Sequence, residues 1–385
     1  MLQRAKIIFS LLLLCGAFAI LPETARAVPF ISEETELNLG READPQIIRQ
    51  YGLYQDKELQ LYVNEVGQKL VSKLSDKVFA KYHFKVVDSS EINAFALPGG
   101  YIYITTGILA ALNSEAELAG VLGHEIGHVI FHHGAKMMIR SIGAQILSIG
   151  GAIASPKNAG QWLMISTAMS SQINLGFGRE AEMESDQQGM FNALEAGYNP
   201  KNMVDFLKSL RHHEIMTGQS YHGFQATHPE TKERIIQADL FSSTMTRHKT
   251  NLVEGREQYI SQLRGLPYDG KRQSNDNRVI KEKYIDIYRV QPGDSFPVIA
   301  DKILKKPKMD LEIAVLNGMK IDDPLKPGTL IKIIREGVYA GKEIVKLEED
   351  TLNSVAKGSA MPNVPELNRI PEDDLKVGRP DIRTR

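Results

Sequence analysis

The chain is almost free of cysteine, because Cys15 is the only one among its 385 residues. Cys15 lies inside an apolar amino-terminal run, so a chain processed after that run has no thiol at all. This excludes disulfides, thiolate metal ligands and cysteine nucleophiles from the mature protein. Net charge is nearly absent as well, at -1, so we expect no partner such as nucleic acid, whose binding needs a strongly positive surface.

The amino-terminal end has the layout of a cleavable signal peptide. Arg4 and Lys6 form a basic start, residues 7–20 form an apolar run, and an Ala-Arg-Ala sequence ends at Ala27. The run is short for a membrane span, so we expect no transmembrane segment in the mature chain. Leucines stand before Cys15 where a lipidation site has small residues, so we expect no lipid anchor there. In a bacterium, these features predict export to the periplasm.

Hydrophobic spacing predicts a mainly helical chain with a few short strands. Residues 137–176 are rich in Gly, Ala, Ser and Met, and we expect them to form helices over the site described below, or alternatively a lid. Residues 101–105 alternate like a strand, and we expect this strand to offer a free edge for an extended polypeptide. The other expected elements are helices at 31–80, from 114, at 178–194, 203–210 and 250–266, and a strand at 84–87.

The sequence His124-Glu125-Ile126-Gly127-His128 stands on the helix that begins at residue 114. Two histidines four residues apart project from one helical face and can bind one zinc ion, with the glutamate beside the open coordination position. Glu125 can there accept a proton from a water molecule that attacks a peptide carbonyl. The alternative is a helix with two solvated histidines, which the apolar residues Ile126, Val129 and Ile130 disfavour.

A third protein ligand has few candidates, because no Asp or Glu occurs between Glu125 and Glu180. Gly134 stands where the extended zinc-binding pattern needs a third histidine. A helix would place Glu182 and Asp186 on one side, where one could bind the metal and the other could orient a ligand histidine. These two residues belong to an acidic cluster made of Glu180, Glu182, Glu184 and Asp186. Taken alone, this cluster could also be a solvated acidic face of a helix.

Several long motifs occur in order between about residues 35 and 265. They are NAFALPGGYIYITTG at 93–107, EAELAGVLGHEIGH at 115–128, REAEMESD at 179–186 and THP at 227–229, followed by Arg234. Together they resemble the HtpX-like gluzincin metallopeptidases, peptidase family M forty-eight, and within them the periplasmic BepA-type branch. The chain departs from that pattern at Ser185, where the family usually has alanine.

The resemblance implies roles for residues outside the zinc motif. Glu182, four residues before Asp186, would be the third zinc ligand beside His124 and His128, and Asp186 would orient a ligand. A loop histidine, His228 or in reserve His222, would reach the zinc to close the site or would stabilise the transition state, whereas by itself His228 could simply cap a loop. Arg234 is expected to order the site.

Two pairs of adjacent histidines, at 132–133 and 212–213, are not expected to bind the metal. Neighbours on a helix diverge by about 100°, so one ion cannot easily take both. The resemblance gives His133 a structural place near the active site. We therefore expect one zinc ion per chain.

The motifs YRVQPGDS at 288–295, Asn317-Gly318 and LKPGTLIKI at 325–333 resemble a LysM module. That resemblance implies a βααβ unit that binds glycans containing N-acetylglucosamine, such as peptidoglycan. Phe296-Pro297 departs from the typical module where a helix would start. A LysM-like scaffold without glycan contact is therefore the alternative.

These observations predict an α+β chain with a mainly helical zincin metalloprotease domain, a small β-sheet in it, and a small βααβ LysM-like domain. We expect it to hydrolyse peptide bonds of misfolded or stalled envelope proteins, outer-membrane proteins among them. The alternative is an envelope assembly factor, anchored at peptidoglycan, whose proteolysis is latched. The expected boundaries are a signal peptide at 1–27, the peptidase domain at 28–268, a linker at 269–284, the LysM-like domain at 285–336 and a tail rich in charge and proline at 337–385.

Overall fold

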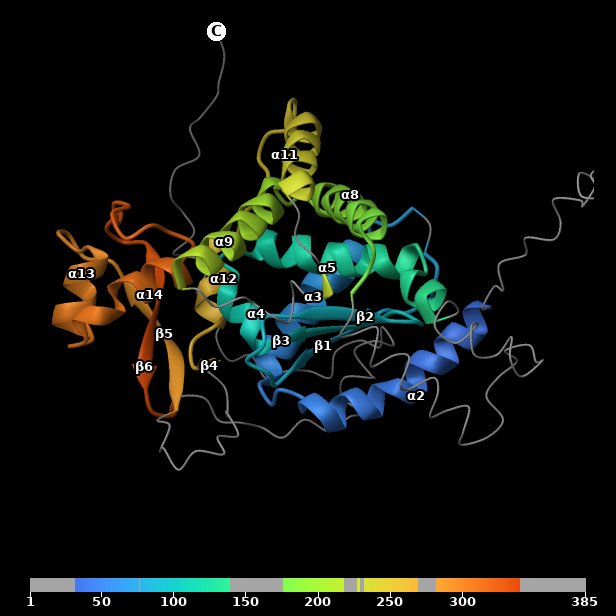
Figure 1. The fold of residues 1–385 in the computed structure, drawn as a ribbon, viewed down its shortest axis with the longest axis horizontal. Helices are drawn as coiled ribbons and strands as arrows, with labels where there is room; N and C mark the ends of the chain where they lie inside the picture. Colours follow the sequence, from blue (N-terminus) through green and yellow to red (C-terminus); the bar gives the residue numbers. More distant parts are fainter. Residues whose placement is uncertain are drawn as a thin grey trace, which may run out of the picture. The chain divides into compact units, whose positions relative to one another are not determined.

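The computed structural model describes residues 32–75, 77–138, 176–217, 227–228, 232–268 and 282–339, with the backbone alone at 212–217. The predicted signal peptide, almost all of the segment 137–176 and the tail from residue 340 lie outside these ranges. Within them the chain is mainly helical and has two small sheets, which confirms the predicted α+β class (Figure 1).

The amino-terminal part contains the elements that position the site. Its helices are α2 (Glu33–Tyr51), α3 (Lys57–Val71), α4 (Thr106–Ala111), α5 (Glu115–Ile130), α8 (Arg179–Glu195), α9 (Lys201–Thr217), α11 (Lys232–Thr246) and α12 (Arg256–Gln262). Its strands are β1 (His83–Val87), β2 (Ala94–Leu97), β3 (Tyr101–Thr105) and β4 (Pro267–Tyr268).

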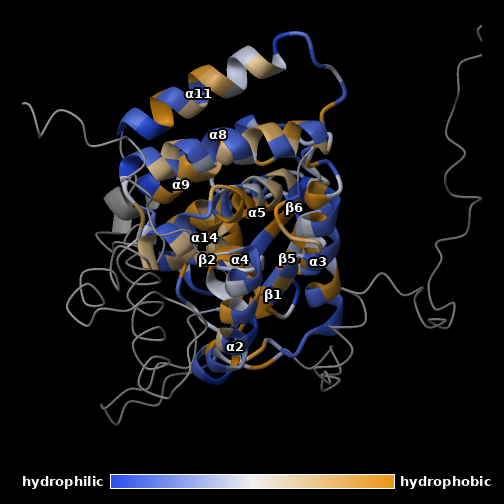
Figure 2. Cartoon of the chain, turned by 90° about the vertical axis from the view of Figure 1, so that its right-hand side faces the viewer, coloured by the Kyte–Doolittle hydropathy of each residue, from blue (hydrophilic) through white to orange (hydrophobic). Residues whose placement is uncertain are grey.

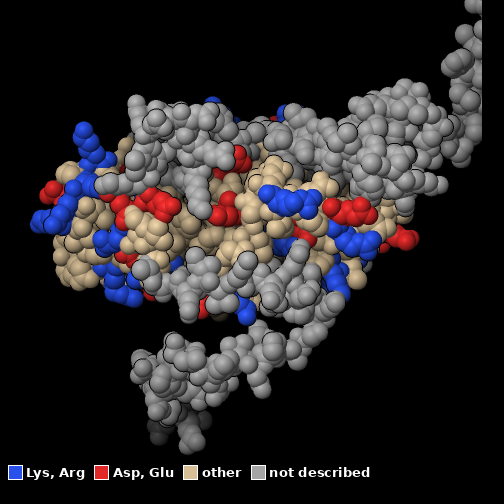
Figure 3. All heavy atoms as spheres, turned by 90° about the horizontal axis from the view of Figure 1, so that it is seen from below, with Lys and Arg blue, Asp and Glu red and all other residues tan. Residues whose placement is uncertain are grey.

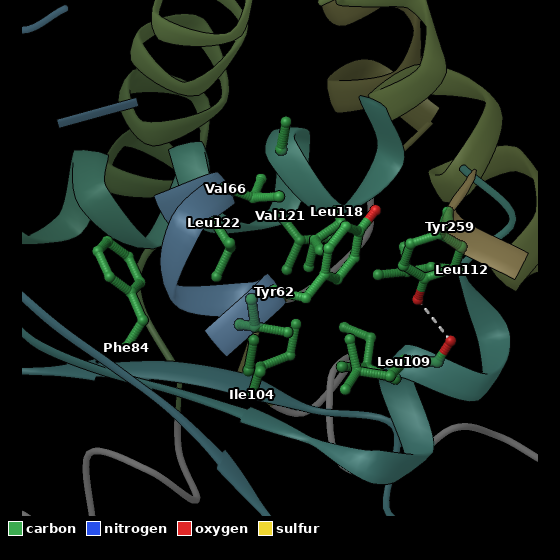
Figure 4. Close-up of a cluster of buried hydrophobic side chains, with 14 of the residues drawn as sticks. Tyr62, Val66, Phe84, Ile104, Leu109, Leu112, Leu118, Val121, Leu122 and Tyr259 are labelled. Atoms are coloured by element: carbon green, nitrogen blue, oxygen red, sulfur yellow. Dashed lines mark hydrogen bonds between the residues drawn. The ribbon is translucent and has the colours of Figure 1, made fainter. Parts of the chain in front are cut away.

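The three-stranded sheet β1-β3-β2 separates two buried layers (Figure 1). Alternation along the strands turns Ala94, Ala96 and Ile104 toward α3 and α5, and Phe95 and Tyr103 toward α2. Figure 4 shows the first of these layers, in which side chains of α3, α5 and α12 interlock above the sheet. Figure 2 shows α8 and α11 stacked above α5 on the side away from the sheet.

Strand β3 lies at the centre of its sheet, so the predicted free edge at 101–105 is wrong. It pairs in parallel with β1 and antiparallel with β2. A period of two tells which face a side chain takes, but it does not tell which strands are neighbours. The edge beside α5 belongs to β2, a segment where the sequence predicted no strand.

The helical spacing predicted over 31–80 is divided between α2 and α3. Gly52, with φ 80°, ends α2, and Asp56 caps α3 by accepting a hydrogen bond from Leu59 N–H at 3.1 Å. The predicted helix at 250–266 is confined to α12, because Val253 forms a β-bridge with Tyr198. The helices predicted at 178–194 and 203–210 are present as α8 and α9.

The carboxy-terminal part has the βααβ order that the sequence predicted. Strand β5 (Lys283–Arg289) pairs antiparallel with β6 (Leu330–Glu336), and the helical segments between them are α13 (Phe296–Val298), η2 (Ile299–Ile303), η3 (Pro307–Met309) and α14 (Asp310–Leu316). Pro297 lies in the first turn of α13, where the missing N–H would have no helical partner. The departure at Phe296-Pro297 is therefore compatible with the fold.

The carboxy-terminal sheet is packed into the core of the amino-terminal part. Strand β4 pairs with β5, and Ile285 and Ile287 of β5 belong to the core cluster around α3 and α5. Lys332 of β6 is 0% exposed, and its Nζ donates to the carbonyl oxygens of Ala110 and Leu112 at 2.6 and 2.7 Å. Buried contacts therefore join the two parts in addition to the chain between them.

Charges of both signs are interspersed over the face that Figure 3 shows, in keeping with the small net charge. Helix α11 exposes Ile236 and Leu240, one turn apart. Within the described ranges, no helix combines the length and the apolar character needed to cross a membrane.

Candidate metal centre

Helix α5 carries His124, Glu125 and His128 into the interior. Ser114 caps its first turn by accepting a hydrogen bond from the N–H of Glu117 at 3.1 Å. The apolar residues of α5 pack in the core cluster and fix the rotation of the helix. The two histidine rings and the carboxylate of Glu125 are consequently buried between the sheet and α8.

Small residues allow α8 to cross α5 at a very short distance. A Cβ at Gly123 would lie 2.8 Å from the carbonyl oxygen of Gly189, and a Cβ at Gly189 would lie 2.6 Å from the backbone nitrogen of His124. A Cβ at Gly127 would lie 3.0 Å from the Cα of Ser185. Larger side chains would separate the helices, so these residues bring the acidic positions of α8 beside the two histidines.

Four buried side chains converge at this crossing. His124 Nε2 lies 3.0 Å from His128 Nε2 and 3.2 Å from His228 Nδ1. The carboxylate of Glu182 lies 3.4 Å from His124 Nε2, 3.5 Å from His128 Nε2 and 3.1 Å from His228 Nδ1. One ligand atom from each residue lies within 4.8 Å of the others, so the group could hold one metal ion.

The donor set fits zinc. A tetrahedral zinc ion with bonds of about 2.0–2.1 Å separates its ligand atoms by about 3.3 Å, close to the observed spacing. His124 Nδ1 lies 2.9 Å from Asp186 Oδ1, so the ring proton resides there and Nε2 presents a lone pair. Lone pairs that face one another away from water are stabilised by a shared cation.

The segment Thr227-His228 holds the fourth donor. The Thr227 hydroxyl donates to Asn93 Oδ1 at 3.2 Å, and its carbonyl oxygen accepts from the N–H of Phe177 at 3.1 Å. His228 Nε2 lies 3.3 Å from the carbonyl oxygen of Ala94, which places the ring proton on Nε2. His228 Nδ1 therefore faces the other three donors as an acceptor.

Asp186 and Arg234 support these donors from behind. Arg234 binds the Asp186 carboxylate through Nε and Nη2, both at 2.8 Å. Its Nη1 lies 2.8 Å from Glu182 Oε2 and donates to the carbonyl oxygen of His228 at 3.3 Å. Arg234 is only 1% exposed, so its guanidinium binds these buried groups and not solvent. The structure thus places both residues where the sequence expected ordering groups.

Two residues support His128, and the sequence analysis missed one of them. Its Nδ1 lies 2.9 Å from His133 Nδ1, and His133 Nε2 lies 3.1 Å from Glu184 Oε2. The chain leaves α5 at Phe131, and His132, with φ 52°, turns it back toward the helix. His133 was expected near the site, but Glu184 counted only as part of an acidic cluster. No periodic pattern marks such a turn.

None of the other histidines whose side chains the structure describes contributes a donor to this group. His132 Nδ1 lies 2.6 Å from Glu36 Oε1, away from the zinc ligands. His222 and the side chains of His212 and His213 lie outside the described residues. Across the described ranges, the single set of residues able to hold a metal consists of His124, His128, Glu182 and His228.

Burial and charge together set the protonation of the site. Burial lowers the pKa of His124, but its hydrogen bonds with Asp186 and Glu182 outweigh this and raise the pKa to about 10. Burial raises the pKa of Glu182, but His228 and His124 outweigh it and hold that pKa well below its usual range. Burial raises the pKa of Glu125 against the opposing effect of His228. Such a site attracts a cation, which would displace a proton from His124.

Comparison with known families agrees with this geometry. A sequence profile of Peptidase family M48 matches residues 57–240, and a profile of the LysM domain matches residues 288–333. The first match contains the zinc motif, the acidic cluster of α8, His228 and Arg234. The family that the sequence motifs suggested is thereby confirmed.

Several known proteins are similar to parts of the chain. It is 29% identical over 248 residues to a putative beta-barrel assembly-enhancing protease of Vibrio cholerae, which covers 60% of this chain and 51% of that protein. It is 32% identical over 166 residues to the beta-barrel assembly-enhancing protease of Escherichia coli K12, covering 41% and 34% of the two chains. The mitochondrial metalloendopeptidase OMA1 of Arabidopsis thaliana is 31% identical over 166 residues, covering 42% and 32%.

The chain spans about a third to a half of the length of these relatives. The comparison therefore speaks for a part of each protein and not for the whole of either. Residues 57–240 therefore form a domain of peptidase family M48, which this chain joins to a LysM domain at 288–333.

Proposed function

We propose that this chain is a zinc-dependent metalloendopeptidase of the bacterial periplasm that hydrolyses peptide bonds of misfolded or stalled envelope proteins. The observation that carries the proposal is the convergence of His124, His128 and Glu182 on one buried point, with Glu125 beside it. The proteases among the relatives support the reaction, and the predicted signal peptide supports the compartment. Two relatives are named for enhancing β-barrel assembly, which favours β-barrel proteins of the envelope as substrates.

The residues of the site divide the chemistry between them. His124, His128 and Glu182 would hold the zinc ion, which when bound acts as a Lewis acid toward the attacking water and the scissile carbonyl. Glu125, the next residue after a ligand, would accept the proton of the attacking water and pass it to the leaving amine. Asp186 keeps the proton of His124 on Nδ1 and so leaves Nε2 free for the metal.

The outer edge of β2 is where an extended substrate would lie. Asn93 accepts a hydrogen bond from Thr105 N–H at 3.1 Å, so its backbone faces β3. The alternation of an antiparallel ladder then turns the polar groups of Ala94 and Ala96 outward. Ala96 lies beside Glu125, and its backbone lowers the pKa of that carboxyl. A polypeptide pairing at this edge would therefore bring its backbone beside the proposed base.

His228 favours a resting state in which this enzyme is latched. Its ring lies between the outer edge of β2 and the other donors, 3.3 Å from Ala94 O and 3.2 Å from His124 Nε2. An incoming substrate would need that space. This favours the second candidate function, an assembly factor with rare proteolysis. If His228 is a latch, His228→Ala should cleave casein faster than wild type. A transition-state role would instead make that variant slower.

The substitution Glu125→Gln tests the reaction itself. It keeps the shape of the side chain but removes the base, so casein cleavage should fall by about 10²–10⁴-fold. Zinc content should remain one ion per chain. Glu65→Gln, exposed on α3, is the control and should cleave casein at the wild-type rate. Unchanged proteolysis in Glu125→Gln would contradict the proposal.

The LysM domain favours attachment to peptidoglycan. Because β5 packs into the peptidase core, the full-length Glu125→Gln protein is the suitable sample. It should pellet with purified peptidoglycan, and soluble N-acetylglucosamine oligomers should reduce the pelleted fraction. Failure to pellet would remove the anchoring part of the proposal and leave the peptidase part standing.

A further inference from the structure

We infer that Glu184 and His133 form a positioning pair that selects the metal-binding form of the His128 ring. The pair joins two elements, since His133 follows α5 while Glu184 lies on α8, 51 residues later. The inference rests on the proposed zinc site. It assigns a task to a carboxylate that the reaction itself does not use.

Each nitrogen of the two rings has a defined neighbour. His128 Nε2 faces the donor centre, 3.0 Å from His124 Nε2, and His128 Nδ1 faces His133 Nδ1 at 2.9 Å. His133 Nδ1 also lies 3.4 Å from the Ser185 hydroxyl. On its other side, His133 Nε2 lies 3.1 Å from Glu184 Oε2.

These contacts allow one consistent placement of protons. A neutral imidazole carries a proton on one nitrogen and a lone pair on the other. To bind a metal through Nε2, His128 must carry its proton on Nδ1 and donate it to His133 Nδ1. His133 then carries its own proton on Nε2 and donates it to Glu184 Oε2, which accepts it.

The opposite placement would disable the ligand. If His133 carried its proton on Nδ1, it would donate to His128 Nδ1. His128 would then hold its proton on Nε2, the atom that must bind the metal. In this arrangement His133 Nε2 has no proton to donate to Glu184, so the carboxylate of Glu184 disfavours it. Glu184 therefore favours the binding tautomer through His133.

The two motif histidines are supported with unequal strength. Asp186 supports His124 directly, is buried, and is held by Arg234. Glu184 supports His128 through a second ring, and its side chain is 50% exposed, so water screens its charge. Loss of groups that support a ligand typically costs about 10–100-fold in metal affinity. We expect the loss of zinc affinity in Glu184→Ala to lie near or below the lower end of that range, at about 3–10-fold.

The test measures zinc affinity and not activity. Metal-free full-length proteins would compete for zinc with a chromophoric chelator. Glu184→Ala should bind zinc about 3–10-fold more weakly than wild type, and His133→Phe about 10–100-fold more weakly. Glu180→Ala is the matched control, because Glu180 is exposed one turn earlier on α8. It should bind zinc as wild type does, and the metal-free forms of Glu184→Ala and Glu180→Ala should unfold at the same temperature.

A double variant tests whether Glu184 acts through His133. In the His133→Phe background, Glu184→Ala should cause no further loss of zinc affinity. Wild-type affinity in Glu184→Ala, or fully additive losses in the double variant, would overturn the inference. The zinc affinity of Glu184→Ala tests the inference even if His133→Phe does not fold, because Glu184 is exposed and its replacement should leave the fold intact. A wild-type chain that binds no zinc would instead overturn the proposed function.

Discussion

At the amino-terminal end of α5, two buried carboxylates meet hydrogen-bond donors. Glu115 accepts the hydroxyl groups of Tyr62 and Tyr198, both at 2.7 Å. Glu117 accepts the backbone N–H of Asn113, also at 2.7 Å. Every one of these contacts joins a donor to an acceptor, so this end of the helix stabilises the fold without any ion.

At the other end of the same helix, the buried groups are not matched in this way. His124, His128 and His228 direct ring nitrogens at one another and at the carboxylate of Glu182. Both ends are buried, so burial alone does not distinguish them. The difference lies in the pairing: the ring nitrogens and the Glu182 carboxylate need a shared cation, either a proton on His124 or a metal ion, and that marks the functional end.

The matched end of α5, which is the group around Glu115 and Glu117, extends into the LysM domain. Lys332 caps the carbonyl oxygens at the end of α4, and Asn317 fixes its backbone from both sides, at 2.9 and 2.8 Å. Burial raises the pKa of the nearby Glu117 to about 7, against the opposing effects of Asn113 and Lys332. A residue of the second domain thus donates to the end of α4, just before the active-site helix begins.

Among the changes that test this comparison, removing zinc should have the largest effect on stability. A ligand at 1,000 times its Kd stabilises the folded state by about 4 kcal/mol, which for a domain of this size corresponds to a fall in Tm on the order of 10 °C when it is removed. Thermal unfolding with and without a chelator would measure the change, together with loss of casein cleavage.

Added zinc should restore both the Tm and the cleavage. The metal-free protein should still unfold cooperatively, because the matched end and the core do not depend on the ion. An unchanged Tm after verified zinc removal would show that the convergent acceptors tolerate the loss of a cation, and the contrast between the two ends would fail.

Lys332→Met should have the next largest effect. The substitution keeps the apolar stem but leaves two buried carbonyl groups without their hydrogen-bond donor. A buried polar group left unsatisfied costs about 1–3 kcal/mol, so the loss of both hydrogen bonds should cost about 3 kcal/mol. Urea unfolding would measure it.

Lys326→Met, exposed in the same domain, is the control and should leave stability unchanged. The zinc affinity of folded Lys332→Met should equal that of wild type, because the substitution lies at the matched end. A variant that keeps its stability would show that the LysM domain is only tethered to the peptidase domain.

Local signals in the sequence predicted much of the site, and the tertiary arrangement supplied the rest. The helical period placed His124 and His128 together, and the long gap without carboxylates directed attention to α8. The pairing of His133 with Glu184 depends instead on where α8 crosses α5. Gly123 with Gly127 was a usable signal, because small residues four apart permit close helix packing.

The sheet shows the same limit from another side. Alternation predicted the strand at 101–105, but its place at the centre depends on pairing with β1 and β2, which no local pattern encodes. Strand β2 was missed because Ala94–Leu97 is short and buried on both faces, so it lacks the alternation of a half-exposed strand.

Tyr62→Phe should have the smallest effect and is the most sensitive test of the matched end. A hydrogen bond to a charged group contributes about 1.5–3 kcal/mol, but Tyr198 still donates to Glu115, so we expect a loss of about 1 kcal/mol in urea unfolding. Combined with Tyr198→Phe, the loss should exceed the sum of the two, because neither hydroxyl then reaches the buried carboxylate.

Tyr288→Phe provides the matched control for that experiment. Its hydroxyl also donates to a carboxylate, Asp294 at 2.9 Å, but in a more exposed place, so its loss should change stability by less than about 0.5 kcal/mol. Zinc affinity should be the same in wild type, Tyr62→Phe and Tyr288→Phe. If Tyr62→Phe weakened zinc binding, the two ends of α5 would be coupled through the helix, and matched pairing at one end would serve the metal site at the other.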